Sequence, residues 1–370
     1  MRDEAERKAD GEAVGGGSRR RRDAEGVGYL VLEDGTVYSG ESVAADGRAF
    51  GEAVFTTSMS GYQETVTDPS YVGQIVCFTA PMVGNYGVAE ERSQSSRVHA
   101  TAVVMRETGS TAWTDWLRER GVVALRGIDT RSLVLHLREQ GAMRAAAVTG
   151  GVCVEDLLAE VRDQPSMQGA ALVAGVSPSD PYTFAPEGDV RVAVVDYGVK
   201  RSILRLLTDA RAAVEVFPHD VDADTLAPYD GVLLGNGPGD PAPLVAETGT
   251  VRELLGRTPV LGVCLGHQLI ALATDHETFK LPFGHRGANH PVVEHATRRV
   301  LVTSQNHGFA VAPGGGGGVT HTSLYDGTVE GLRYPDLRAR SAQFHPEASP
   351  GPHDGAPIIA EWVEELRSVA

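Results

Sequence analysis

The chain has few cysteines and no long apolar run, and both absences limit what it can be. Its 370 residues include three cysteines, none arranged as Cys-x-x-Cys, so the sequence offers no disulfide framework and no zinc-binding pattern. No apolar stretch approaches the roughly 20 residues of a membrane span. The N-terminus lacks the apolar core of a signal peptide and carries too many acids for a transit peptide. We therefore expect a cytoplasmic protein that makes no membrane contact.

Positive charge is also scarce. Lysine and arginine number 33 against 49 acidic residues, a formal net charge of −16, which argues against general nucleic-acid binding. A phosphate-binding loop is missing too, because the glycine-rich stretch NGPGDP at 236–241 lacks the Gly-Lys-Ser/Thr ending. Apolar residues make up 42% of the chain, ample for packed cores, and the length predicts two or three domains.

The most informative stretch is an apolar segment with a cysteine at its centre. Residues 259–270, PVLGVCLGHQLI, predict a buried strand, a tight turn and the start of a helix. Gly262 and Gly266 flank Cys264 at the nucleophile-elbow spacing, where a Cβ at either glycine would crowd the turn. The helix N-terminus favours a thiolate, and the N–H of Leu265 would face a developing oxyanion. The alternative is that Cys264 is a buried structural cysteine. The presence of a catalytic base elsewhere in the chain would decide between the two interpretations.

A candidate base lies in the segment AQFHPE at 342–347. Pro346 favours an extended conformation at His345, and residues two apart in an extended segment face the same way. Glu347 can then orient His345 and favour its imidazolium. An isolated His-Pro-Glu would predict a surface turn, but together with the elbow it predicts a Cys264–His345–Glu347 triad for covalent acyl transfer.

The pair GVCLGHQ and FHPE resembles the class I glutamine amidotransferases. Two stretches of the first half, residues 51–88 (GEAVFTTSMSGYQETVTDPSYVGQIVCFTAPMVGNYGV) and 127–146 (GIDTRSLVLHLREQGAMRAA), resemble the small-subunit family of carbamoyl-phosphate synthetase, whose N-terminal domain other class I amidotransferases lack. The resemblance implies that Cys264 attacks the γ-carboxamide of L-glutamine. It also implies that His345 protonates the departing ammonia and then activates water. The implied glutamine-binding residues are Ser70, Gly237, Gly239, Leu265, Gln268, Asn306, Gly308 and Phe309.

The same resemblance implies a partner. In the family, ammonia passes to a large subunit that binds bicarbonate and ATP with magnesium and makes carbamoyl phosphate for arginine biosynthesis, pyrimidine biosynthesis or both. We therefore expect a heterodimer, or a higher oligomer of heterodimers, with no cofactor on this chain.

The strand and helix pattern predicts an α/β protein with a mixed N-terminal domain and a C-terminal domain built on an open, mostly parallel sheet flanked by helices. Ligands of such sheets bind at the carboxyl ends of the strands, where both the elbow and the 236–241 loop fall. The expected segments are a disordered extension at 1–27, the N-terminal domain at 28–150, a connecting helix and linker at 151–190, and the amidotransferase domain at 191–370.

Residues 283–292, FGHRGANHPV, are expected to form a structural loop near the site or the partner interface. His285, His290 and His295 might suggest a metal site, but no carboxylate or thiolate accompanies them at a typical spacing. We therefore expect no metal.

Three alternatives stay open at this point. The chain could serve another synthase as its class I glutaminase, although its first half argues against this. It could be a non-catalytic regulatory scaffold, although all three triad residues are present. It could be a free-standing γ-glutamyl hydrolase, which would need neither a partner nor ATP.

Overall fold

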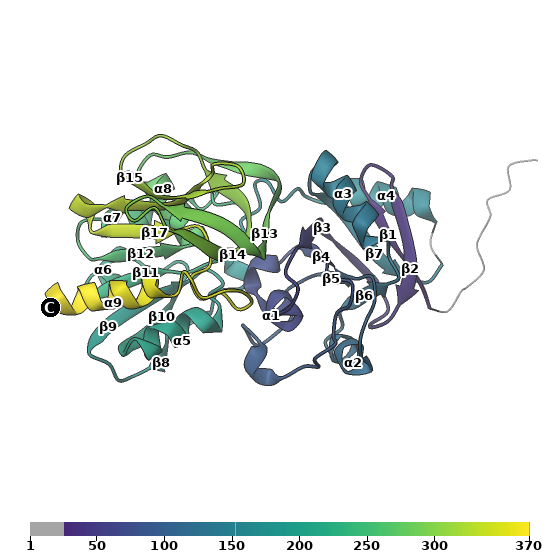
Figure 1. The fold of residues 1–370 in the computed structure, drawn as a ribbon, viewed down its shortest axis with the longest axis horizontal. Helices are drawn as coiled ribbons and strands as arrows, with labels where there is room; N and C mark the ends of the chain where they lie inside the picture. Colours follow the sequence, from purple (N-terminus) through teal and green to yellow (C-terminus); the bar gives the residue numbers. More distant parts are fainter. Residues whose placement is uncertain (1–25, 152, 370) are drawn as a thin grey trace, which may run out of the picture.

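In a computed structural model, which describes residues 26–151 and 153–369, the chain forms two domains that lie side by side (Figure 1). The first contains a closed β-barrel and the second a 10-stranded sheet. The predicted α/β architecture is confirmed. The extension expected over 1–27 lies outside the described residues except for its last two positions, and Val27 already begins the first strand.

The barrel of the first domain combines antiparallel and parallel pairing. A hairpin of β1 and β2 forms its start, with Val31 opposite Val37. Strands β3, β4, β5 and β6 then run parallel to one another, and β7 closes the barrel between β1 and β3. In barrel order the strands are β1 (Val27–Leu32), β2 (Val37–Ser42), β6 (Val123–Arg126), β5 (Ala102–Val104), β4 (Gln74–Phe78), β3 (Arg48–Thr56) and β7 (Met143–Thr149).

Helices and short 3-10 turns connect the barrel strands. Asp129 caps α3, because its carboxylate accepts a hydrogen bond from the N–H of Ser132 at 3.0 Å. The helical elements of this half are α1 (Tyr62–Thr67), η1 (Pro69–Tyr71), η2 (Glu90–Arg92), α2 (Thr111–Glu119), α3 (Thr130–Gln140), α4 (Val154–Asp163) and η3 (Val173–Gly175).

The sheet of the second domain has a parallel centre and antiparallel flanks. Strands β10, β9, β11, β12 and β17 run parallel, and the rest pair antiparallel. In sheet order the strands are β14 (Val300–Val311), β13 (Thr278–Glu294), β15 (Gly318–Ser323), β16 (Val329–Tyr334), β17 (Ala339–Ala342), β12 (Val260–Val263), β11 (Gly231–Leu234), β9 (Val190–Asp196), β10 (Ala212–Pro218) and β8 (Tyr182–Ala185).

Helices cover both faces of this sheet. Successive side chains of a strand point to opposite faces, so one strand can contribute to both cores. In β9, Ala193 and Val195 pack into a core with α6 (Ala223–Leu226), α7 (Val245–Leu254) and α8 (Leu265–Ala273). Val192 and Val194 pack into the opposite core with α5 (Arg201–Asp209) and α9 (Pro357–Val369). A short 3-10 turn, η4 (Pro335–Leu337), precedes β17.

One expectation about an irregular segment is wrong. Residues 283–292 form part of the long strand β13 rather than a loop. Their glycines and proline suggest a loop, but register shifts between Lys280 and His285 and between Gly287 and His290 absorb them as bulges against β14. The connecting segment expected over 151–190 contains helix α4 and, near its end, the short strand β8, which pairs with β10 at the sheet edge.

The long hairpin of β13 and β14 reaches from the second domain to the barrel (Figure 1). The N–H of Thr57 donates to the carbonyl of Arg286 at 3.1 Å, and that of Ala142 donates to the carbonyl of Pro282 at 2.7 Å. This contact brings residues of the barrel domain next to the carboxyl ends of the parallel strands. Within the described residues, none of the helices combines the length and the apolar character needed to cross a membrane.

Candidate active site

Cys264 lies on a strained turn between β12 and α8. Its φ is +54°, a conformation that non-glycine residues rarely adopt and that often marks functional sites. A Cβ at Gly262 would lie 2.5 Å from the carbonyl oxygen of Gly266, and one at Gly266 would lie 2.2 Å from that of Leu234. The crowding that was predicted for both glycines is confirmed. The thiol, which is 3% exposed, is held at the N-terminal end of α8.

His345 and Glu347 form a buried pair beside this turn. The Nδ1 atom of His345 lies 2.6 Å from Oε1 of Glu347, and both side chains are almost fully buried. Nε2 of His345 has no hydrogen-bond partner among the described residues, so it is free to exchange a proton. Nε2 of Gln343, two residues earlier, lies 3.8 Å from the sulfur of Cys264. Cys264 also acts on the pKa of His345, so the thiol, the imidazole and the carboxylate lie in one buried region.

Lys200 is a fourth member of this group, and the sequence analysis did not identify it. Its Nζ lies 2.8 Å from Oε1 of Glu347 and donates to the carbonyl of Ala348 at 2.6 Å. Burial alone would raise the pKa of Glu347, but the charges of Lys200 and His345 outweigh it and lower this pKa to about 2. Glu347 is therefore a carboxylate at neutral pH.

His345 is ionised as well. Burial alone would lower its pKa, but the charges of Glu347 and of the Cys264 thiolate outweigh burial and raise the pKa of His345 to about 10. The site therefore holds an imidazolium, oriented by a carboxylate, next to Cys264. A cation in this place favours the thiolate form of a cysteine nucleophile.

The loop at 236–241 follows β11 and faces the elbow. A Cβ at Gly237 would lie 2.3 Å from the carbonyl oxygen of Tyr197, and one at Gly239 would lie 2.4 Å from that of Ala170. Gly239 also has a φ of +92°. Glycine is thus required at both positions for the backbone to approach the cavity closely.

A small cavity lies in front of the thiol, and most of the predicted glutamine-binding residues line it. Seven of the eight do so: Ser70, Gly237, Gly239, Gln268, Asn306, Gly308 and Phe309. Leu265 does not line the cavity; its predicted role concerns its backbone N–H at the start of α8. Cys264 forms part of the same lining, together with Gln74, Met167, Arg286 and His307, which the sequence analysis did not select.

Asp68 ties the two domains together at this cavity. One carboxylate oxygen accepts from the N–H of Ser70 at 2.9 Å, and the other accepts from Nδ2 of Asn306 at 3.0 Å. Asn236, which is fully buried, donates from Nδ2 to the hydroxyl of Ser70 at 2.9 Å. The turn at 68–70 of the barrel domain therefore positions two segments of the sheet domain. The sequence analysis did not identify this role of Asp68.

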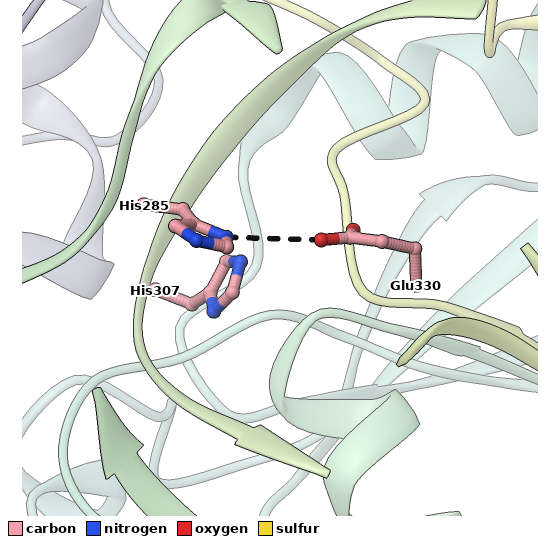
Figure 2. A group of neighbouring side chains, drawn as sticks. All are labelled: His285, His307 and Glu330. Atoms are coloured by element: carbon pink, nitrogen blue, oxygen red, sulfur yellow. Dashed lines mark ion pairs between the residues drawn. The ribbon is translucent and has the colours of Figure 1, made fainter. Parts of the chain in front are cut away.

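A polar cluster lies behind the cavity, where His285, His307 and Glu330 come together from β13, β14 and β16 (Figure 2). Each offers one possible metal-ligand atom, and these atoms lie within 4.8 Å of one another. Glu330 supplies the carboxylate that local spacing did not reveal. His285 and Glu330 form an ion pair at 3.7 Å, and the opposite nitrogen of His285 lies 2.9 Å from Asp326.

Hydrogen bonds already occupy most of these atoms. The ring nitrogens of His307 lie 2.7 Å from the carbonyl oxygen of Phe309 and 3.0 Å from Oε1 of Gln305, and Nε2 of Gln305 donates to Glu330 at 2.8 Å. The carbonyl of Phe309 also accepts from Gln268 at 2.9 Å. We interpret the cluster as a scaffold that fixes the segment around Phe309, not as a metal centre.

Metal removal provides a test of this interpretation. We expect dialysis against EDTA to leave the melting temperature of the protein unchanged, because the cluster is held by its own hydrogen bonds and ion pair. A lowered melting temperature that added Zn²⁺ restores would contradict the interpretation. A sample dialysed without EDTA is the control.

Comparison with known proteins identifies the family. Residues 30–147 match "Carbamoyl-phosphate synthase small chain, CPSase domain" and residues 193–364 match "Glutamine amidotransferase class-I". A carbamoyl phosphate synthase small chain of Thermotoga maritima is 41% identical over 92% of this chain and 98% of its own length. The chain belongs to the carbamoyl-phosphate synthase small chain family.

Other members of the family are similar over the same extent. A carbamoyl phosphate synthase small chain of Listeria monocytogenes serovar 1/2a is 44% identical over 91% of this chain and 96% of its own length. A relative from Lactiplantibacillus plantarum, named a pyrimidine-specific small chain, is 42% identical over 91% of this chain and 95% of its own length. The family similarity thus spans both domains and the cavity between them.

Proposed function

We propose that this small chain hydrolyses L-glutamine with Cys264 as the nucleophile and delivers the ammonia to a large synthetase subunit. As a member of its family, it is the glutamine-dependent small chain of a carbamoyl-phosphate synthase, a ligase. One observation carries the assignment of residues. A strained, buried cysteine beside a His345–Glu347 pair opens onto a cavity lined by seven residues expected to bind glutamine.

The reaction begins with attack of the Cys264 thiolate on the γ-carboxamide carbon. The oxyanion that forms accepts hydrogen bonds from the backbone N–H groups of Leu265 and Gly237. Each preorganised donor of this kind contributes about 3 kcal/mol of transition-state stabilisation. His345 donates its proton to the departing nitrogen, ammonia leaves, and a γ-glutamyl thioester remains. His345 then takes a proton from water, which attacks the thioester and releases glutamate.

The charge on the Cys264 thiolate determines when His345 gives up its proton. While Cys264 is a thiolate, its charge helps to keep the pKa of His345 at about 10, which holds the proton on the imidazole. Attack transfers that charge from the sulfur to the oxyanion, which the backbone N–H groups of Leu265 and Gly237 bind. The pKa of His345 then falls, and the imidazolium becomes a better acid just as the leaving nitrogen needs a proton. Glu347 remains ionised beside Lys200 and keeps the imidazole oriented.

A partner must consume the ammonia. Free ammonia is mostly protonated at neutral pH, and this chain has no phosphate-binding loop of its own. We therefore assign ATP, with magnesium, and bicarbonate to the large subunit, and no cofactor to this chain. A heterodimer, or an oligomer of heterodimers, is the expected assembly. Carbamoyl phosphate would serve arginine biosynthesis, pyrimidine biosynthesis or both, and the pyrimidine-specific name of one relative favours the pyrimidine route.

The test is to measure glutamine hydrolysis by the purified chain alone and with its large subunit, with and without bicarbonate and ATP. We expect slow hydrolysis by the chain alone and a sharp rise when all three are present, with carbamoyl phosphate as product. Fast hydrolysis that is indifferent to all three would identify a free-standing hydrolase. Service to another synthase is disfavoured, because residues 30–147 match the small-chain domain.

A further inference from the structure

The cavity contains a buried cation that forms no ion pair with a carboxylate of the described residues. Arg286 on β13 is 3% exposed and lines the cavity together with Cys264. Nη1 donates to the carbonyl of Phe283 at 2.9 Å, and Nε has no hydrogen-bond partner in the described part of the chain. Glu52 affects Arg286 only through longer-range charge and is itself paired with Lys280.

An unpaired buried guanidinium is costly for a fold. Transfer of a charge out of water is unfavourable unless a counter-charge and hydrogen bonds replace the lost hydration. A guanidinium has five N–H donors in a planar fork, and one hydrogen bond within the protein leaves most of them for a ligand. The planar fork matches a carboxylate, which it can bind through two parallel hydrogen bonds.

The position of Arg286 fits one end of a glutamine molecule. It lies directly opposite Asn306 in the β13–β14 ladder, and the carbonyl of Asn306 is 3.7 Å from the sulfur of Cys264. A Cβ at Gly308 would lie 3.2 Å from Nη2 of Arg286. The missing side chain of Gly308 therefore leaves one edge of the guanidinium open beside residues expected to bind glutamine.

We propose that Arg286 binds the α-carboxylate of L-glutamine and thereby selects an α-amino acid amide as substrate. The inference rests on the proposed function, because it assumes that the γ-carboxamide lies at Cys264. The α-carboxylate is the single anionic group of glutamine, and Arg286 is the cation that lines the described cavity. Oε1 of Gln74, which is buried and has no hydrogen-bond partner among the described residues, supplies an acceptor for the α-ammonium group.

A different role for Arg286 is stabilisation of the Cys264 thiolate, since the two charges interact. The two roles predict different kinetics. Loss of a carboxylate partner weakens glutamine binding and leaves the thiolate intact, so it raises KM. Loss of thiolate stabilisation lowers kcat and slows alkylation of the thiol by a neutral reagent for every substrate.

The experiment uses the complex of both subunits and compares wild type with Arg286→Gln and Arg286→Lys. Arg340→Gln is the matched control, because Arg340 is also largely buried but is paired with Glu365 at 3.1 Å and lines a different pocket. Three substrates are assayed: L-glutamine, 4-aminobutanamide, which lacks the α-carboxylate, and glutaramic acid, which lacks the α-amino group. Alkylation of Cys264 by iodoacetamide and ammonia-dependent synthesis are measured in parallel.

We expect Arg286→Gln to raise KM for glutamine on the order of 100-fold, as for loss of one partner of a buried charge pair, with a smaller change in kcat. Arg286→Lys should recover part of the loss. With 4-aminobutanamide, wild type and Arg286→Gln should be equally poor, whereas glutaramic acid should still distinguish them. Alkylation and ammonia-dependent synthesis should match wild type, which shows that the variant is folded.

An unchanged KM for glutamine would overturn the inference. So would an equal penalty of Arg286→Gln on glutamine and on 4-aminobutanamide, or slowed alkylation of Cys264. Absence of glutamine hydrolysis in the wild-type complex is a separate result, because it would overturn the proposed function itself.

Discussion

Replacing Cys264 by serine is expected to abolish glutamine hydrolysis while leaving ammonia-dependent synthesis of carbamoyl phosphate by the assembled complex unchanged. Serine is nearly isosteric, so the strained turn at φ +54° and the packing of α8 should survive. Its hydroxyl does not ionise at neutral pH, however, so the site loses the thiolate that the proposed mechanism requires. We expect a fall in glutamine-dependent kcat on the order of 10⁴-fold, as when a catalytic nucleophile is removed.

The measurement compares glutamine-dependent and ammonia-dependent rates in the same preparation. Cys153→Ser is the control, because Cys153 is exposed and lies at the start of α4. Retention of most glutamine hydrolysis by Cys264→Ser would disprove the nucleophile assignment. Loss of both rates together would mean that the variant has lost its fold or its partner.

The second large effect is expected at the base. His345→Asn should lower glutamine-dependent kcat on the order of 10³- to 10⁴-fold, because it removes both the proton donor and the cation that stabilises the thiolate. Glu347→Gln should cost less, since it keeps the imidazole and removes only the charge that orients it 2.6 Å away.

Kinetics of the two variants, with iodoacetamide alkylation of Cys264, would check this order. We expect alkylation to slow in both, and more in His345→Asn. If Glu347→Gln proved the more damaging of the two in kcat, the roles assigned here would have to be exchanged or abandoned. Ammonia-dependent synthesis again reports whether the variants are folded.

The pKa values also set the pH range over which the ion pair stabilises the fold. The pKa of Glu347 is lowered to about 2, so its contribution is present above the ordinary carboxyl pKa and is lost as the pH falls through about 2. The pKa of His345 is raised to about 10, so its contribution is present below the ordinary imidazole pKa and is lost as the pH rises through about 10. The pair therefore remains ionised throughout the neutral range.

The sequence predicted those features of the molecule that depend on local pattern. The elbow around Cys264 was visible because two glycines, a cysteine and an apolar strand lie within a few residues. The relation of His345 to Glu347 was visible because an extended backbone aligns residues two apart. The strand and helix pattern likewise predicted a sheet flanked by helices. Resemblance to a family, and not local pattern, supplied Ser70, Asn306 and the partner.

Tertiary structure decided which distant side chains share the site. Lys200 follows β9 and Glu347 follows β17, two strands that β11 and β12 separate in the sheet. The ion pair between the two residues therefore has no local signal in the sequence. Residues 283–292 suggested a loop because they contain two glycines and a proline, but pairing with β14 makes them a strand. That strand buries Arg286 opposite Asn306. Charges and hydrogen bonds between residues far apart in sequence depend on how strands are ordered in the sheet, and this order is fixed by packing of the whole chain.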